Sequence, residues 1–197
     1  MTNYFEVFGL DRTLAIDAAE LQRRFYELSR QHHPDFHQGA SAEEQARTLE
    51  TSARVNAAYR ALRDPIARVE YLVRLEDGQE TKEGDAVKPK APPELLEEMF
   101  EIQEALHEAR SGELDHATRA TLVAQRERLV ARRAAEEARI IGTLSATWDA
   151  AAAADRPKAL IALKEALAIR AYLRPVVGDL AEALGGAEEE HVAHHRH

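Results

Sequence analysis

Helix-start signals recur along this chain at intervals that fit long helices, and they restrict its fold more than any other feature. A capping-box spacing, an acceptor followed three residues later by glutamate, opens stretches at Asp17 and at Ser41. Pro65 marks a third start, because proline suits the first position of a helix. Apolar residues then recur at helical rather than alternating spacing. The sequence therefore predicts an all-α fold.

The composition supports this prediction and bounds the size of the fold. The chain has 197 residues, of which 45% are hydrophobic and 31% charged, enough for one large domain or two small ones. Its apolar content leans on Ala and Leu, which favour helices. No apolar run approaches the roughly 18–20 residues of a membrane span, and the first residues lack the pattern of a signal peptide. We expect a cytoplasmic protein.

Cysteine content and net charge exclude several function classes. The chain has no cysteine, so it cannot form a disulfide, use a thiol nucleophile or hold an iron–sulfur cluster through thiolates. Its formal net charge of −9 argues against phosphate-driven nucleic-acid binding. No pairing of a nucleophile with a base is legible. The sequence therefore favours a binding protein over an enzyme, with no cofactor.

Two N-terminal helices are expected to pair. A short helix over 4–10 precedes a longer one over 18–32, whose buried stripe consists of Leu21, Phe25 and Leu28. Pro34 ends the longer helix, because proline disfavours helical geometry in the residue before it. The next helix opens at Ser41, and so short a connection predicts an antiparallel hairpin.

The turn of this hairpin reads His33-Pro34-Asp35. In one interpretation it is an ordinary turn, in which Pro34 stops the helix and Asp35 accepts backbone hydrogen bonds. In the other, Pro34 stiffens the loop and holds His33 and Asp35 in a fixed relation for a partner, which lowers the ordering cost of binding.

A connection rich in Gly, Pro and charge, residues 76–93, separates this region from a second helical one. Helical patterns then cover about 94–110, 114–153 and 156–184, which predicts an antiparallel three-helix bundle. Asp115 is a candidate cap for the second of these helices. Trp148 is expected in the core, and Pro175 is expected to kink or interrupt the last helix. The His-rich end, residues 186–197, is predicted to be a disordered tail without a metal site.

The helix over 94–110 carries three kinds of side chain in separate stripes. The core stripe consists of Leu95, Met99, Ile102 and Leu106. Beside it lie two further apolar residues, Leu96 and Phe100. A carboxylate stripe follows, made of Glu97, Glu101, Glu104 and Glu108. An apolar pair rimmed by acid is typical of a docking surface for a basic partner. A wide core stripe with a solvated charged face is the alternative interpretation.

The position of His33-Pro34-Asp35 between two helices, after a basic helix, resembles the J-domain of DnaJ-class co-chaperones. The resemblance implies stimulation of the ATPase of a DnaK-class chaperone. It also implies which residues contact that chaperone. They are His33, Pro34 and Asp35 in the turn, and Arg23, Arg24, Tyr26 and Arg30 on the preceding helix. From the apolar stripe alone, the three arginines are expected to stay solvated.

Further motifs resemble the HscB family of iron–sulfur cluster co-chaperones. They are Tyr4-Phe5, Phe8-Gly9-Leu10, Asp64-Pro65, Arg68 and Glu70-Tyr71-Leu72. The resemblance implies an L-shaped, two-domain arrangement. Its expected parts are a J-domain at 1–75, a linker at 76–93, a C-terminal three-helix bundle at 94–185 and the tail at 186–197.

The same resemblance implies two protein partners, an HscA-type chaperone and an IscU-type cluster scaffold protein. The scaffold-binding residues carried over are Leu96, Phe100, Glu101, Glu104, Glu108 and Ile169, with Tyr172 as the alternative to Ile169. The chain is thus expected to deliver the scaffold to the chaperone and stimulate its ATPase. A general DnaJ-like adaptor for a different client is the second hypothesis.

Overall fold

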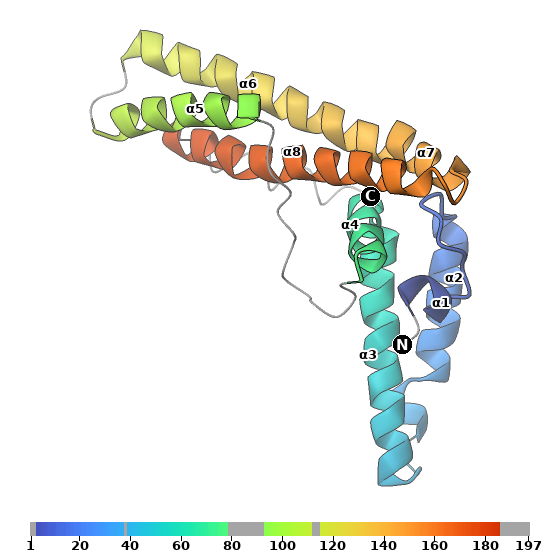
Figure 1. Ribbon diagram of the computed structural model, residues 1–197. Helices are drawn as coiled ribbons and strands as arrows, with labels where there is room; N and C mark the ends of the chain where they lie inside the picture. The colour runs from blue at the N-terminus through green and yellow to red at the C-terminus, as the bar shows by residue number, and fades with distance from the viewer. Residues whose placement is uncertain (1–2, 38, 79–92, 112–114, 186–197) are drawn as a thin grey trace. The chain divides into compact units, whose positions relative to one another are not determined.

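A computed structural model describes residues 3–37, 39–78, 93–111 and 115–185, and every regular element in these ranges is a helix (Figure 1). By its internal contacts the chain divides into two compact units. Unit 1 consists of the described residues before residue 79 together with Ile140–Leu163. Unit 2 consists of the described residues of 93–139 together with the described residues from Lys164 onward. No helix within the described ranges is long and apolar enough to cross a membrane. The predicted all-α fold is confirmed.

Unit 1 is built around a helical hairpin. Its N-terminal elements are α1 (Tyr4–Val7), α2 (Ala18–Gln31), the 3₁₀ turn η1 (Pro34–His37), α3 (Ala42–Arg63) and α4 (Pro65–Glu76). Helices α2 and α3 lie side by side (Figure 1), and the rings of Phe25 and Tyr59 stack between them at 4.0 Å. The hairpin predicted from the short connection is therefore present.

Three of the predicted helix starts are formed by the expected side chains. Asp17 accepts from the backbone N–H of Ala19 at 2.9 Å, Ser41 forms a complete capping box with Glu44, and Asp64 caps α4. The box predicted at Asp17 is wrong in its second half. Glu20 turns to the guanidinium groups of Arg23 and Arg24 instead, because both partners of these hydrogen bonds are charged, whereas a backbone N–H is neutral.

Aromatic residues of α1 and α4 close the core of unit 1. Phe5 and Phe8 are buried. Tyr4 stacks on Tyr71 with ring centroids 4.4 Å apart, and the Tyr71 hydroxyl accepts from the Tyr4 backbone N–H at 2.8 Å. One tyrosine thus supplies both apolar contact and a partner for a backbone donor at the start of α1.

The loop between α1 and α2 is held from two sides at Leu14. Arg68, a buried residue of α4, donates to the carbonyls of Leu14 and Leu62. Asp149 accepts from the backbone N–H groups of Leu14 at 2.7 Å and Ala15 at 2.8 Å. Burial lowers the pKa of the Arg68 guanidinium, and the carboxylates of Asp64 and Asp149 oppose that effect.

Asp149 belongs to the second stretch of unit 1, Ile140–Leu163. That part contains the π-helical turn η2 (Ile140–Leu144), α7 (Ser145–Ala150) and the first residues of α8 (Arg156–Ala183). The helix predicted over 114–153 is therefore broken at η2, where the Ser145 hydroxyl donates to the Ile140 carbonyl at 2.6 Å. Trp148 is 1% exposed, which confirms it as a core residue.

Unit 2 packs α5 (Pro93–Ser111), α6 (His116–Arg139) and the remainder of α8 around one apolar core. The buried members of this core are Ile102, Leu106, Leu122, Leu129, Leu173, Val176, Val177 and Leu180. Asp115 begins α6 by accepting from Thr118 N–H at 2.7 Å, and this hydrogen bond lowers the pKa of Asp115.

Pro175 does not interrupt the last helix, so of the two predicted effects, a kink or an interruption, the interruption is wrong. Helix α8 runs without a break from Arg156 to Ala183. Leu173 precedes the proline and Val176 and Val177 follow it, and all three are buried in the core of unit 2. This packing on both sides of Pro175 offsets the lost backbone hydrogen bond. Residues 79–92 of the expected linker and the expected tail at 186–197 lie outside the described ranges.

Candidate functional site

The turn after α2 presents His33, Pro34 and Asp35 to solvent. The helix ends at Gln31, and η1 begins at Pro34. The side chain of His33 is 53% exposed and that of Asp35 72%. The surface of this turn is therefore free to meet a partner, as its interpretation as a binding loop requires.

Short contacts fix the relation between His33 and Asp35. The Asp35 backbone N–H donates to Nδ1 of His33 at 3.3 Å, and the Asp35 carboxylate Oδ2 lies 3.6 Å from the same nitrogen. Pro34 restricts the backbone between them. The His33 ring is thus tied to the backbone of Asp35 before any partner binds, which reduces the entropy lost on binding.

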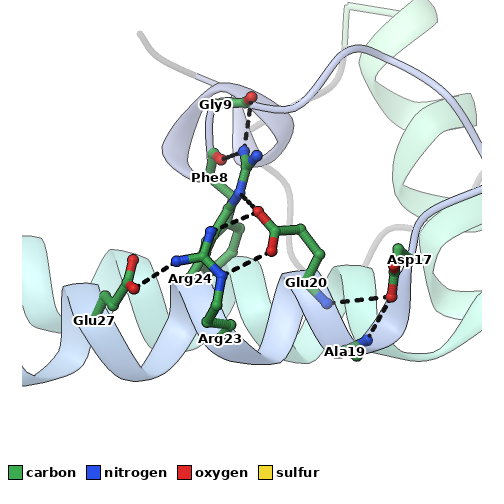
Figure 2. A network of polar contacts seen from close by, with 8 residues as sticks. All are labelled: Phe8, Gly9, Asp17, Ala19, Glu20, Arg23, Arg24 and Glu27. Carbon is green, nitrogen blue, oxygen red and sulfur yellow. Dashed lines mark hydrogen bonds and ion pairs between the residues drawn. The ribbon is translucent and has the colours of Figure 1, made fainter.

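The three arginines predicted to face a partner have different surroundings, and Figure 2 shows those of Arg23 and Arg24. Arg23 pairs with Glu20 and with Glu27, and its side chain is 56% exposed. Those two carboxylates raise the pKa of Arg23, while hydrogen bonds from Arg23 and Arg24 lower the pKa of Glu20 to about 2. Arg23 lies on the surface, but its charge is offset by its own helix.

Arg24 was expected to be solvated, but its side chain is only partly exposed because it joins α2 to the end of α1. Its guanidinium donates to the carbonyls of Phe8 and Gly9 as well as to Glu20 (Figure 2), and its side chain is 31% exposed. Gly9 has a φ of 59°, a left-handed conformation that glycine adopts without strain. This turn brings both carbonyls to one guanidinium. Arg24 therefore stabilises the packing of α1 against α2.

Tyr26 and Arg30 are exposed on α2 one turn apart. The Tyr26 ring is 61% exposed, and its hydroxyl accepts from Gln22 at 3.3 Å. Arg30, in the last turn of α2, forms no ion pair with any residue in the described ranges. Of the three predicted arginines, it is the one whose charge is not offset by a neighbouring carboxylate in this part of the chain.

A second candidate site, made of exposed apolar side chains, lies on α5 of unit 2. Leu96 is 48% exposed and Phe100 72%, whereas Ile102 and Leu106 on the same helix are each 1% exposed. Leu96 and Phe100 are therefore not an extension of the core stripe. The side chains of Glu97, Glu101 and Glu104 are also exposed.

One of the residues predicted beside this apolar pair has other surroundings, and another lies outside the described side chains. Ile169 on α8 is half-buried and packs against the core of unit 2, as does its alternative, Tyr172. The side chain of Glu108 lies outside the described part of the structure, as does that of Leu95. Glu98 pairs with Arg128 and Arg132 of α6, at 2.6 and 2.7 Å, so this carboxylate is engaged within the bundle.

Phe36 is an exposed residue beside the turn that sequence reasoning did not identify. Its ring is 71% exposed and lies edge-on to the His33 imidazole, with centroids 5.9 Å apart. The available signal was an aromatic residue in an otherwise polar turn. Within the described ranges, no group of three or more His, Asp or Glu side chains is arranged to hold a metal ion.

Comparisons with known proteins agree with this geometry. Residues 3–71 match the DnaJ domain family. The fold is similar to that of chaperone HscB from Vibrio cholerae, with a TM-score of 0.59 and 23% identity over 91% of this chain and 96% of that chain. It is also similar to the crystal structure of human co-chaperone protein HscB, with a TM-score of 0.60 and 24% identity over 91% of this chain and 81% of that chain. At these identities the two structures show a shared fold.

Proposed function

We propose that this chain, which has a DnaJ domain at residues 3–71 and the fold of the HscB chaperones, is a cytoplasmic co-chaperone of iron–sulfur protein maturation. Its DnaJ domain stimulates the ATPase of an HscA-type, DnaK-class chaperone. Its C-terminal helices bind an IscU-type scaffold protein and deliver it to that chaperone. The chain itself catalyses no step, because ATP hydrolysis belongs to the chaperone.

The observation that carries this proposal is the exposed turn at His33-Pro34-Asp35 inside a DnaJ domain. The His33 ring accepts a hydrogen bond from the Asp35 backbone N–H, and both side chains stay open to solvent. A turn buried in a packed interior could not reach a partner. By binding one conformational state of the chaperone better than the other, this surface shifts the chaperone toward the state that hydrolyses ATP.

The client surface is supported by the apolar pair on α5. Leu96 and Phe100 stay accessible while their neighbours Ile102 and Leu106 fill the core. Removing apolar area from water favours association, and the carboxylates of Glu97, Glu101 and Glu104 favour a basic partner surface. Holding the scaffold on the same chain as the DnaJ domain raises the scaffold's effective concentration at the chaperone.

An ATPase assay with purified HscA-type chaperone and IscU-type scaffold tests the proposal. The full chain should raise ATP turnover, and His33→Gln should abolish the increase without loss of helical content. His116→Gln, the same substitution at an exposed histidine of α6, serves as the control and should stimulate normally. Full stimulation by His33→Gln would contradict the proposed function.

A general DnaJ-like adaptor for another client is the second candidate. It shares the chaperone-binding turn and differs only in what α5 binds. The exposed Leu96 and Phe100 favour a dedicated client surface over a featureless bundle. A direct binding measurement between the chain and the scaffold separates the two. Absence of binding, together with normal stimulation of the chaperone, would favour the adaptor.

A further inference from the structure

Phe36 is an aromatic side chain that the fold holds in water beside the chaperone-binding turn. It is 71% exposed although it lies in an ordered 3₁₀ turn, and its backbone N–H donates to the His33 carbonyl at 3.1 Å. The His33 ring meets it edge-on, with an interplanar angle of 67°. These contacts restrict the ring without covering it. A restricted, uncovered aromatic ring loses little entropy when a partner buries it.

The arginines of α2 have little unpaired charge to offer a partner, which makes the Phe36 ring more important for binding. Arg23 is paired with Glu20 and Glu27, and Arg24 is committed to Glu20 and to two backbone carbonyls. Both charges are thus largely offset before a partner arrives. Arg30, next to the turn, forms no ion pair in the described part of the chain. Of the three arginines predicted to face a partner, Arg30 is thus the one without an ion pair in the described part of the chain.

We infer that Phe36 is the principal apolar contact of this surface and Arg30 its principal charge, and that both meet the ATPase domain of the DnaK-class chaperone. This inference rests on the proposed function and specifies its recognition chemistry. The occupant is an apolar hollow on the chaperone with an acidic rim. The hollow receives the Phe36 ring, and the rim receives the Arg30 guanidinium.

This division of roles has a consequence for salt dependence. Attraction between exposed charges is screened by salt, whereas burial of an apolar ring is not. A surface that relied on three free arginines would lose most of its affinity as salt rises. A surface built on Phe36 and a single arginine should lose much less.

The test is a titration of chaperone ATPase stimulation with the full chain, at about 0.05 M and about 0.5 M salt, which correspond to weak and strong screening. Phe36→Ala should raise the half-maximal concentration about 10-fold or more at both salt levels. Arg30→Gln should raise it at low salt, and this effect should largely vanish at high salt. Leu49→Ala removes another exposed apolar side chain, 62% exposed on α3, and should have no effect.

Two further variants keep the outcomes distinct. Phe36→Leu retains apolar area and should keep part of the affinity. If Phe36→Ala does not fold, Phe36→Leu is compared with Phe36→Ser, which removes the apolar area and should show the lower affinity. If Phe36→Ala behaves like Leu49→Ala while His33→Gln abolishes stimulation, this inference is overturned and the proposed function stands. If His33→Gln also stimulates normally, the proposed function itself fails.

Discussion

The carboxylate of Asp149 binds the backbone of Leu14, with 2.7 Å between Asp149 Oδ1 and the Leu14 nitrogen. The two residues are 135 positions apart in the sequence. On the other side of Leu14, Arg68 donates to the Leu14 carbonyl. The loop that joins α1 to α2 is therefore fixed by α4 and by α7, and the N-terminal helices depend on a segment far along the chain.

Asp149→Ala is expected to destabilise unit 1. The substitution leaves the N–H of buried Leu14 without its acceptor, and an unsatisfied buried donor costs about 1–3 kcal/mol. Urea unfolding followed by circular dichroism measures the loss. Asp11→Ala, at an exposed aspartate of the same loop, is the matched control and should leave the midpoint unchanged. Equal midpoints for the two variants would show that the contact contributes nothing.

Arg24→Lys should destabilise the contact between α1 and α2. A lysine ammonium lacks the planar fork that serves Glu20 and the carbonyls of Phe8 and Gly9 together. The expected loss in the free energy of unfolding is about 1 kcal/mol, since the site is partly exposed and screened by solvent. Arg23→Lys retains surface ion pairing and should not measurably change the unfolding midpoint. The prediction fails if the two variants unfold alike.

Glu20 should make unit 1 sensitive to acid. Its pKa falls from the ordinary 4.5 to about 2 because Arg23 and Arg24 donate hydrogen bonds to the carboxylate. A depressed folded-state pKa contributes stability that is complete above pH 4.5 and is lost as pH falls toward 2. Glu20→Gln should therefore be less stable than the parent at pH 6, and the difference should shrink below pH 3. Unfolding curves across this range, for both proteins, provide the measurement.

The double variant with Leu96→Ala and Phe100→Ala should weaken scaffold binding by about 10-fold or more, because each substitution removes exposed apolar area from the docking surface. Calorimetric titration with an IscU-type protein measures the affinity. Val123→Ala, on the exposed surface of α6, is the control. The fold should survive in both variants, since none of the three residues is buried. Unaltered scaffold affinity in the double variant would favour the general-adaptor hypothesis.

Tyr71→Phe should separate the two roles of this tyrosine. The substitution keeps the stack on Tyr4 and removes the hydroxyl that accepts from the Tyr4 backbone N–H at 2.8 Å. The expected cost is about 0.5–1.5 kcal/mol in the free energy of unfolding. Hydrogen exchange at the Tyr4 amide should speed up more than exchange at amides of α3. Unchanged protection of that amide would contradict the assigned hydrogen bond.

The parts of the fold that were predictable from the sequence depend on nearby residues. Asp17, Ser41 and Asp64 cap helices through backbone groups two or three residues away, so the pattern alone identifies them. Helical spacing also separates Phe100 from Ile102 and Leu106, but it left open whether Phe100 belongs to a wide core stripe, and the structure decides that it is exposed. Local geometry determines the three caps.

The features that the sequence did not reveal depend on competition or on distant partners. Glu20 has the spacing of a capping box, but two arginines within four residues compete for the same carboxylate. The role of Arg24 requires knowing that the turn at Gly9 folds back onto α2. Pro175 is tolerated because packing on both sides of it maintains the helix. No local pattern reports such tertiary contacts.

The bond between Asp149 and Leu14 also orders events during synthesis. A nascent chain emerges from its N-terminus, so the four helices up to α4 leave the ribosome well before Asp149 exists. Until then, the loop at Leu14 lacks one of its two fastening points. The finished form of the N-terminal unit is thus delayed until translation has passed Asp149, and a chain that stops before this residue lacks the contact.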